Sequence, residues 1–196
     1  MQKSNTNKYE IKIYENKARD VYLFIRQMKS NYQNYKYSCH LHTKKSAHKT
    51  NLGSNWIEYL YNNLIRNKKT MLDILYDYEQ YDKLGFVFPE SYNEIINGYS
   101  DFYNLNFFLH AENKNNINFL LKRIFHKFKA GVKLVFPVGN MFWAKTKSIY
   151  QIFNIRLKYP KELGQTNETI MHAIERVWLY LVKLNGYYYK SLLKYY

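Results

Sequence analysis

A basic, histidine-rich loop is the segment best equipped for chemistry. Its cationic and imidazole side chains are His40, His42, Lys44, Lys45 and His48. The loop follows a predicted strand over residues 37–41, and in open α/β sheets ligands bind beyond the carboxyl ends of strands. Lysine side chains and loop N–H groups bind the oxygens of a diphosphate. We therefore expect a diphosphate-binding loop, while a solvated basic loop stays open as the alternative.

A metal site is the weakest interpretation of the same loop. His40 and His42 are two residues apart, and alternate residues of a strand point to opposite faces of its sheet. The two imidazoles are therefore not expected to reach one ion, and we expect no metal here.

A second motif, Gly139-Asn-Met-Phe-Trp-Ala144, lies in an extended apolar segment. A glycine in such a segment often marks a bulge or a close backbone approach to a ligand. Phe142 and Trp143 have aromatic faces that can pack against a sugar ring. Asn140 adds an amide beside them, so the motif is a candidate acceptor or sugar site. The alternative is that both aromatic residues belong to the core.

A third group lies on a predicted helix that begins near residue 166. His172, Glu175 and Arg176 are three and four residues apart, so they share one face of the helix. A carboxylate there can act as the general base that takes a proton from an acceptor hydroxyl. An internal ion pair of Glu175, with Arg176 or with a lysine elsewhere in the chain, is an equal alternative.

The elements that position these groups follow from hydrophobic periodicity. Alternation predicts strands, and spacings of three and four predict amphipathic helices. Strands are predicted over 9–14, 37–41 and 84–88, an extended segment over 134–143, and helices from Asp20 and over 53–65, 70–78, 116–128 and 166–184. This alternation predicts an α/β fold with a largely parallel sheet. Residues 1–196 are expected to form a single domain, with a Tyr- and Lys-rich tail over 187–196 that has no assigned role.

Composition narrows the class of protein. The chain has 196 residues, 46% of them hydrophobic, which indicates a folded domain. The net charge of +15 favours polyanionic partners, so a basic nucleic-acid-binding protein is one alternative. A single cysteine, Cys39, excludes an internal disulfide. The sequence shows neither a signal peptide nor an apolar run of roughly 20 residues. We expect a cytoplasmic protein, or one held by its charge on the inner face of the membrane.

Four blocks in order resemble the rhamnan synthesis protein F family. Together they extend from about residue 10 to residue 186. They are Glu15-Asn-Lys-Ala-Arg-Asp-Val21, His42-Thr-Lys-Lys-Ser46, Gly139-Asn-Met-Phe-Trp-Ala144, and Glu162-Leu-Gly-Gln165 followed by His172-Ala-Ile-Glu-Arg176. The resemblance implies assembly of rhamnose-containing or O-antigen-type surface polysaccharide. It also implies a GT-A-like, Rossmann-like glycosyltransferase that moves a sugar from a nucleotide-sugar to a lipid-linked glycan acceptor.

The resemblance also implies roles for individual residues. The first block, with Asn16, Arg19 and Asp20, matches the segment that packs beside the nucleotide. The strand that ends at His42 falls where metal-dependent relatives carry an Asp-x-Asp motif. Histidine and lysine stand there instead, so the resemblance implies a metal-independent enzyme without a cofactor, in which cations neutralise the leaving diphosphate.

Two departures from the family pattern qualify this expectation. The usual G-Q-x-D-G-T is here Gly164-Gln-Thr-Asn-Glu-Thr169, so Glu168 is the candidate that replaces the missing carboxylate. Family members also have further strands and helices before the first block. The chain is therefore expected to lack its N-terminal part, and a partner chain or self-association is expected to complete the sheet. An inactive structural fragment of such an enzyme is the alternative to an active hexosyltransferase.

Overall fold

The fold is built on one four-stranded sheet. The computed structural model describes residues 11–14, 19–43, 50–92, 111–124, 135–158 and 169–192, without the side chains of residues 50–53 and 111–113. In chain order the elements are α1 (Arg19–Asn31), β1 (Tyr37–His40), α2 (Thr50–Leu64), α3 (Lys68–Gln80), β2 (Leu84–Pro89), α6 (Ala111–Arg123), β3 (Phe142–Lys145), η2 (Thr146–Ser148), α7 (Gln151–Asn154), α8 (Ile170–Leu184) and β4 (Tyr188–Leu192).

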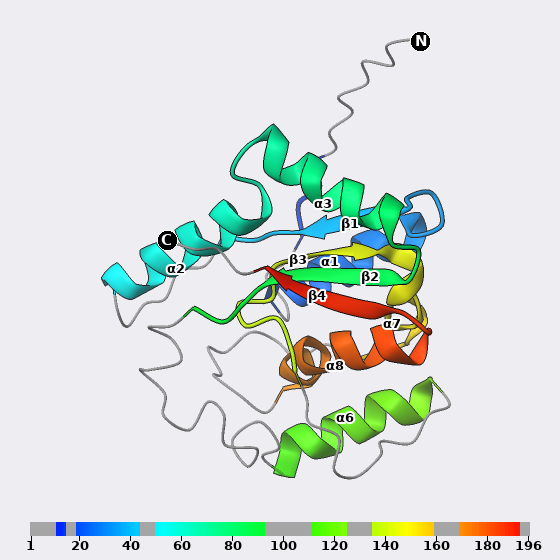
Figure 1. Cartoon of the computed structure of the whole chain (residues 1–196). Helices are drawn as coiled ribbons and strands as arrows, with labels where there is room; N and C mark the ends of the chain where they lie inside the picture. The colour runs from blue at the N-terminus through cyan, green and yellow to red at the C-terminus, as the bar shows by residue number, and fades with distance from the viewer. Residues whose placement is uncertain are drawn as a thin grey trace.

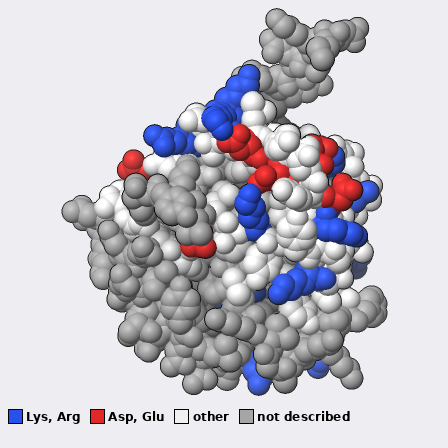
Figure 2. Space-filling view, viewed as in Figure 1, with Lys and Arg blue, Asp and Glu red and all other residues white. Residues whose placement is uncertain are grey.

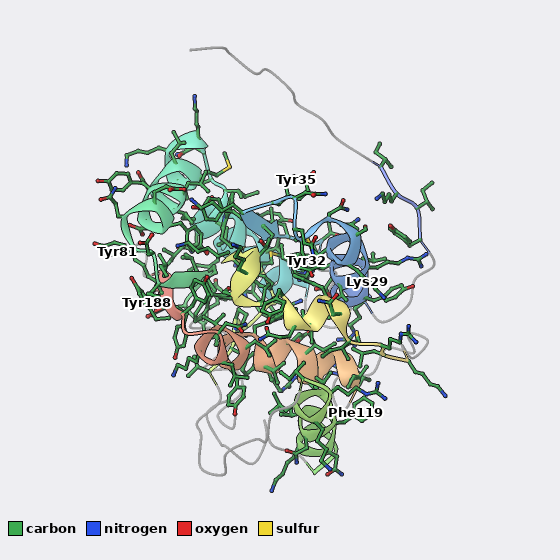
Figure 3. All side chains as sticks on the ribbon, turned by 90° about the vertical axis from the view of Figure 1, so that its right-hand side faces the viewer. Lys29, Tyr32, Tyr35, Tyr81, Phe119 and Tyr188 are labelled. Carbon is green, nitrogen blue, oxygen red and sulfur yellow. The ribbon has the colours of Figure 1, made fainter. Side chains whose placement is uncertain are left out.

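Helices cover both faces of the sheet (Figure 1). On one face, Phe86, Phe142 and Ala144 pack with the buried stripes of α1, α6 and α8. On the other face, Val87 and half-buried Trp143 pack with α2 and α3. Alternate side chains of a strand point to opposite faces, so these two sets come from neighbouring positions in β2 and β3. Figure 3 shows the layers from the side, with Phe119 marking α6 beneath α8.

The pairing of the strands differs from the predicted one. The order is β1-β3-β2-β4, with β3 antiparallel to both β1 and β2, and β4 parallel to β2. The α/β class is confirmed, but the prediction of a largely parallel sheet is wrong, because two of the three pairings are antiparallel. Three strands still share one direction, since β1, β2 and β4 all run opposite to β3. Their carboxyl ends therefore meet at the same edge of the sheet.

The two ends of the chain also depart from the sequence-based prediction. A strand was predicted over residues 9–14, yet residues 11–14 form no strand, and Ile11 and Ile13 are 81% and 96% exposed. The C-terminal tail, for which the sequence indicated no role, supplies β4. Its side chains alternate between exposed and half-buried, as expected for an edge strand with one solvated face.

Candidate functional site

Buried polar side chains converge at the edge where β1 ends and β3 begins. Asp20, in the first turn of α1, accepts a hydrogen bond from Nε2 of His40, with 3.0 Å between the atoms. The side-chain amide of Asn140 donates to the same Oδ2 atom over 2.6 Å. Nε2 of His42 lies 3.7 Å from it. With Trp178, described next, these residues are the Asp20 cluster.

Asn140 links this carboxylate to α8. Its Oδ1 accepts a hydrogen bond from Nε1 of Trp178 over 2.9 Å. An indole N–H can only donate, so the amide oxygen must face Trp178 and the amide nitrogen must face Asp20. The orientation of Asn140 is thereby fixed, and three separate segments of the chain are joined through one 3% exposed side chain.

His42 turns back toward the same carboxylate. Because β1 ends at His40, strand alternation does not extend to residue 42, and both imidazoles reach Asp20 with ring centroids 5.7 Å apart. The expectation that they point to opposite faces is wrong. Nε2 of His42 also donates to the carbonyl of Gly139 over 2.8 Å, and Tyr61 donates its hydroxyl to the carbonyl of His42.

The Asp20 carboxyl is the acidic group at the centre of the site. Burial raises the pKa of the Asp20 carboxyl, but the hydrogen bond from His40, the nearby His42 and the Asn140 amide outweigh it and hold the pKa well below its ordinary value. Burial lowers the pKa of His40, and Asp20 opposes this only in part. At neutral pH, Asp20 is therefore ionised and His40 is neutral.

Backbone strain is concentrated at the same place. Arg19 and Asn140 have φ angles of 59° and 55°, and Gly139 has 97°. For residues with a side chain, this left-handed region costs roughly 1–2 kcal/mol. A fold keeps such conformations where the surrounding structure requires them, and they cluster at functional sites. Among the described residues, the two non-glycine residues with a positive φ lie in or next to the Asp20 cluster.

The start of α8 contacts the start of α1 beside the cluster. Nε2 of His172 lies 3.2 Å from Nη1 of Arg19, and the other ring nitrogen lies 2.8 Å from the hydroxyl of Thr169. Arg176 donates to the backbone carbonyl of His172 over 2.7 Å. Burial lowers the pKa of Arg176, and the charge of Glu175 counteracts this.

The two aromatic residues of the second motif lie on opposite faces of the sheet. Phe142 is completely buried and packs against Phe24, Phe86 and Trp178. The indole of Trp143 donates to the carbonyl of Leu64 over 3.1 Å. These contacts favour the core interpretation of both residues, and Phe142 also supports the ring of His40 from below, with centroids 5.3 Å apart.

The structure brings some of the predicted site residues together and does not describe others. It brings together Arg19, Asp20, His42, Gly139, Asn140 and His172, from all four blocks, and adds His40 and Trp178. Trp178 was missed because an indole in an apolar stripe has the pattern of a core residue, and no local signal distinguishes the two. Five predicted site residues lie outside the described residues: Asn16, Lys44, Lys45, His48 and Glu168.

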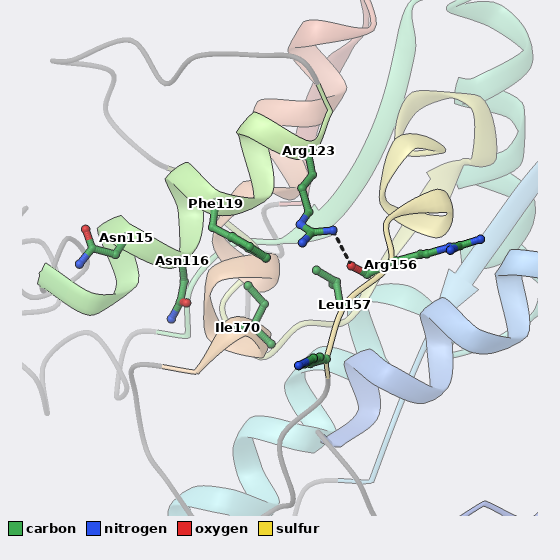
Figure 4. Close-up of a pocket in the computed structure, with 8 residues that line it drawn as sticks. Asn115, Asn116, Phe119, Arg123, Arg156, Leu157 and Ile170 are labelled. Atoms are coloured by element: carbon green, nitrogen blue, oxygen red, sulfur yellow. Dashed lines mark hydrogen bonds between the residues drawn. The ribbon is translucent and has the colours of Figure 1, made fainter.

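A separate groove lies between α6 and the segment before α8 (Figure 4). It encloses about 740 Å³ and has an apolar floor that includes Phe119, Leu157 and Ile170. Arg123 at its rim donates to the carbonyl of Arg156 over 3.1 Å. No residue of the Asp20 cluster lines this groove, so its size alone does not mark it as the site of chemistry.

The sequence also matches one known protein family. The sequence model of a family described as rhamnan synthesis protein F matches residues 1–187. The chain belongs to this family. Membership suggests a part in rhamnan polysaccharide synthesis. The family match covers every residue of the Asp20 cluster. The chain matches no curated protein and no solved structure.

Proposed function

We propose that this member of the rhamnan synthesis protein F family transfers a sugar from a nucleotide-sugar to a lipid-linked glycan acceptor. The observation that carries the proposal is the convergence of residues from all four blocks at one edge of the sheet. The carboxyl ends of β1, β2 and β4 meet there, which is where α/β sheets bind their ligands. A structural fragment alone has no need for a buried carboxylate that three segments of the chain hold in place.

The diphosphate of the donor is proposed to bind at the end of β1. His42 closes the described part of the cluster, and the sequence places Lys44 and Lys45 directly after Thr43. In the transfer, the acceptor oxygen bonds to the anomeric carbon, the bond from that carbon to the diphosphate breaks, and the diphosphate leaves with the electron pair. Positive charge at this point stabilises the leaving group.

The proton of the acceptor hydroxyl needs a base, and Asp20 is poorly suited to that role. Its pKa is held well below the ordinary value, so the carboxylate is a weak base at neutral pH. We assign it to holding His40 and Asn140 in position. Glu168 and Glu175 remain the proposed bases, and His172, which contacts Arg19, is proposed to position the start of α8 against the donor.

The surface charge does not favour nucleic acid as the ligand. On the face shown in Figure 2, Lys and Arg stand in separate groups with Asp and Glu between them. Several cations are paired with carboxylates, as in Lys36 with Glu79 and Lys190 with Asp77. Nucleic-acid binding is therefore one outcome of the test below.

Within the described residues, no helix has both the length and the apolar character needed to cross a membrane.

The proposal is tested by thermal-shift measurements of the full chain with dTDP-rhamnose, UDP-glucose and GDP-mannose, followed by assays of nucleoside diphosphate release. We expect at least one donor to raise the melting temperature, and Lys44→Ala with Lys45→Ala to abolish the shift. Lys69→Ala is the matched control, because Lys69 lies on α3 in an exposed pair with Asp73. A folded chain that binds none of the donors, or one that binds DNA with a steep salt dependence instead, contradicts the proposal.

A further inference from the structure

Three donor atoms of the Asp20 cluster lie close enough together for one metal ion to draw them into its coordination shell. Oδ2 of Asp20 lies 3.0 Å from Nε2 of His40 and 3.7 Å from Nε2 of His42. All three residues offer a ligand atom within 4.8 Å of the others. Metal–ligand bonds of about 2.0–2.2 Å at tetrahedral or octahedral angles place neighbouring ligand atoms roughly 3–3.5 Å apart. We propose that Asp20, His40 and His42 bind one divalent transition-metal ion.

The donor set indicates which ions fit. Two imidazoles and one carboxylate suit Zn²⁺, Co²⁺, Fe²⁺ or Mn²⁺, whereas Mg²⁺ and Ca²⁺ prefer sites made of oxygen alone. Three protein ligands leave at least one coordination position open, as in catalytic rather than structural metal sites. An oxygen atom of a phosphate is a ligand of the kind that such a position takes.

The surrounding residues hold the three ligands in place. Asn140 donates to the same Asp20 oxygen and is itself fixed by Trp178. The ring of His40 packs against the rings of Phe24 and Phe142, with centroids 4.5 Å and 5.3 Å away. Partners of this kind fix the orientation of metal ligands and typically change metal affinity 10–100-fold when they are lost. The cluster has this supporting shell on rigid elements, the ends of β1, β3 and α1.

The same distances also describe a network of hydrogen bonds without a metal. In that state, Nε2 of His40 donates to Asp20, and Nε2 of His42 donates to the carbonyl of Gly139. A bound ion takes the place of these two protons, and each imidazole then carries its proton on the other ring nitrogen. The two interpretations differ in one measurable property, which is binding of a metal ion by the folded chain.

This proposal differs from the expectation of metal independence, which the resemblance implied because histidine and lysine stand in place of an Asp-x-Asp motif. The geometry removes only the argument that the two imidazoles face apart. Metal binding itself stands on the geometry of the three ligands. Only the suggested use of the bound ion, which is to offer an open coordination position to an oxygen of the diphosphate, rests on the proposed transfer function. Binding is therefore measured in the absence of any nucleotide-sugar, so that a failure of one proposal is distinguishable from a failure of the other.

The test begins with the full chain after a chelator has removed bound metal. Binding of Co²⁺ is measured from its visible absorption during a titration, and binding of Zn²⁺ is measured by calorimetry. We expect one ion per chain, no competition from Mg²⁺ at the same concentration, and at least tenfold weaker binding by His42→Asn and by Asp20→Asn. His126→Gln is the matched control, since His126 lies outside the four sequence blocks, and the affinity of this variant for the ion should stay within twofold of the wild type.

Circular dichroism of each variant shows whether it has folded. Should Asp20→Asn fail to fold, His42→Asn decides the question. His42 is the more accessible of the two histidine ligands, so its replacement disturbs the fold less. Equal affinity of the wild type and His42→Asn, or no binding by the folded wild type, overturns the proposal. Equal loss in His126→Gln also overturns it, since it shows that the ion binds through histidines elsewhere on the chain.

Discussion

Two groups of buried polar side chains lie at opposite ends of the ladder between β1 and β3, and they are bonded in different ways. The Asp20 cluster lies where His40 pairs with Phe142, and the second group lies where Tyr37 pairs with Lys145. We call the second group the Lys145 cluster, and it consists of Lys145, Thr146 and Ser148. Both groups are buried, so burial alone does not distinguish a binding site from a structural feature.

The partners of the side chains do distinguish them. In the Lys145 cluster every partner is a backbone carbonyl: Lys145 donates to Tyr81 and Asp82, Thr146 to Tyr35, and the Ser148 hydroxyl lies 2.8 Å from two carbonyl oxygens. These hydrogen bonds give partners to backbone carbonyl groups that would otherwise be buried without one. In the Asp20 cluster the main partners are other side chains, around an ionised carboxylate. Such a network mainly fixes polar side chains relative to one another, which is what a ligand site requires.

The largest effect is expected from Gly85→Ala, at the Lys145 end. A Cβ there would lie 2.6 Å from Cβ of Tyr187 and 2.8 Å from Cβ of Ser148, and neither atom is the end of a flexible side chain. We expect about 3 kcal/mol of lost stability, measured by urea unfolding. Gly186→Ala is the control, because nothing lies within 4 Å of it and only its φ of 74° is unfavourable, which costs about 1 kcal/mol. Equal costs would show that the Lys145 end is not tightly packed.

A smaller loss of stability is expected from Gly139→Ala, at the Asp20 end. The φ of 97° is unfavourable for alanine, and the new Cβ would lie 2.8 Å from Cδ1 of Leu60, the movable end of a side chain. We expect a cost of about 2 kcal/mol. Because Gly139 accepts the hydrogen bond from His42, this variant should also lose affinity for the donor that binds the wild type, whereas Gly85→Ala should not. Unchanged affinity in a folded Gly139→Ala protein would separate this turn from the site.

The smallest effect is a dependence on alkaline pH that belongs to the Lys145 end alone. Burial raises the pKa of Tyr78 well above its ordinary value, and Lys145 lies above its ring. The folded-state pKa exceeds that of the unfolded chain, about 10, so this contribution is complete below pH 10 and is lost as the pH rises further. The slope is about 1.4 kcal/mol per pH unit at most.

Tyr78→Phe isolates this contribution among the many tyrosines. Urea unfolding from pH 9 to pH 11 should show a shallower decline for the variant than for the wild type, with similar stability at pH 7. Parallel curves for the two proteins would mean that another group controls alkaline unfolding.

Much of the fold could be predicted because its signals are local. The alternation of Tyr37 to His40 and the apolar run of Leu84 to Pro89 gave β1 and β2, and helical spacing gave the long helices. The direction of β3 relative to its neighbours could not be predicted. A hydrophobic pattern predicts that a segment is a strand, but it does not say which strands pair with it or in which direction they run. β4 was missed because exposed tyrosines and lysines at an edge resemble a solvated tail.

The site was predictable to the extent that its residues lie in distinctive blocks. His42 and Asn140 were found in this way, and Asp20 came from the family resemblance. Their meeting point was not predictable, because it depends on where β1 stops and on the left-handed turn at Gly139 and Asn140. The convergence of His40 and His42 follows from that ending, which strand alternation alone could not indicate.

The most direct test of the difference between the two clusters is a comparison of Asp20→Asn with Ser148→Ala, using calorimetric affinity for the donor that binds the wild type and urea unfolding of both variants. Asp20→Asn should bind the donor at least tenfold more weakly. It should also lose stability at neutral pH, because a carboxyl whose pKa is lowered in the folded state stabilises the fold. Ser148→Ala should lose about 1–3 kcal/mol of stability and keep its affinity. Unchanged donor affinity in a folded Asp20→Asn protein would contradict the assignment of the Asp20 cluster as a ligand site.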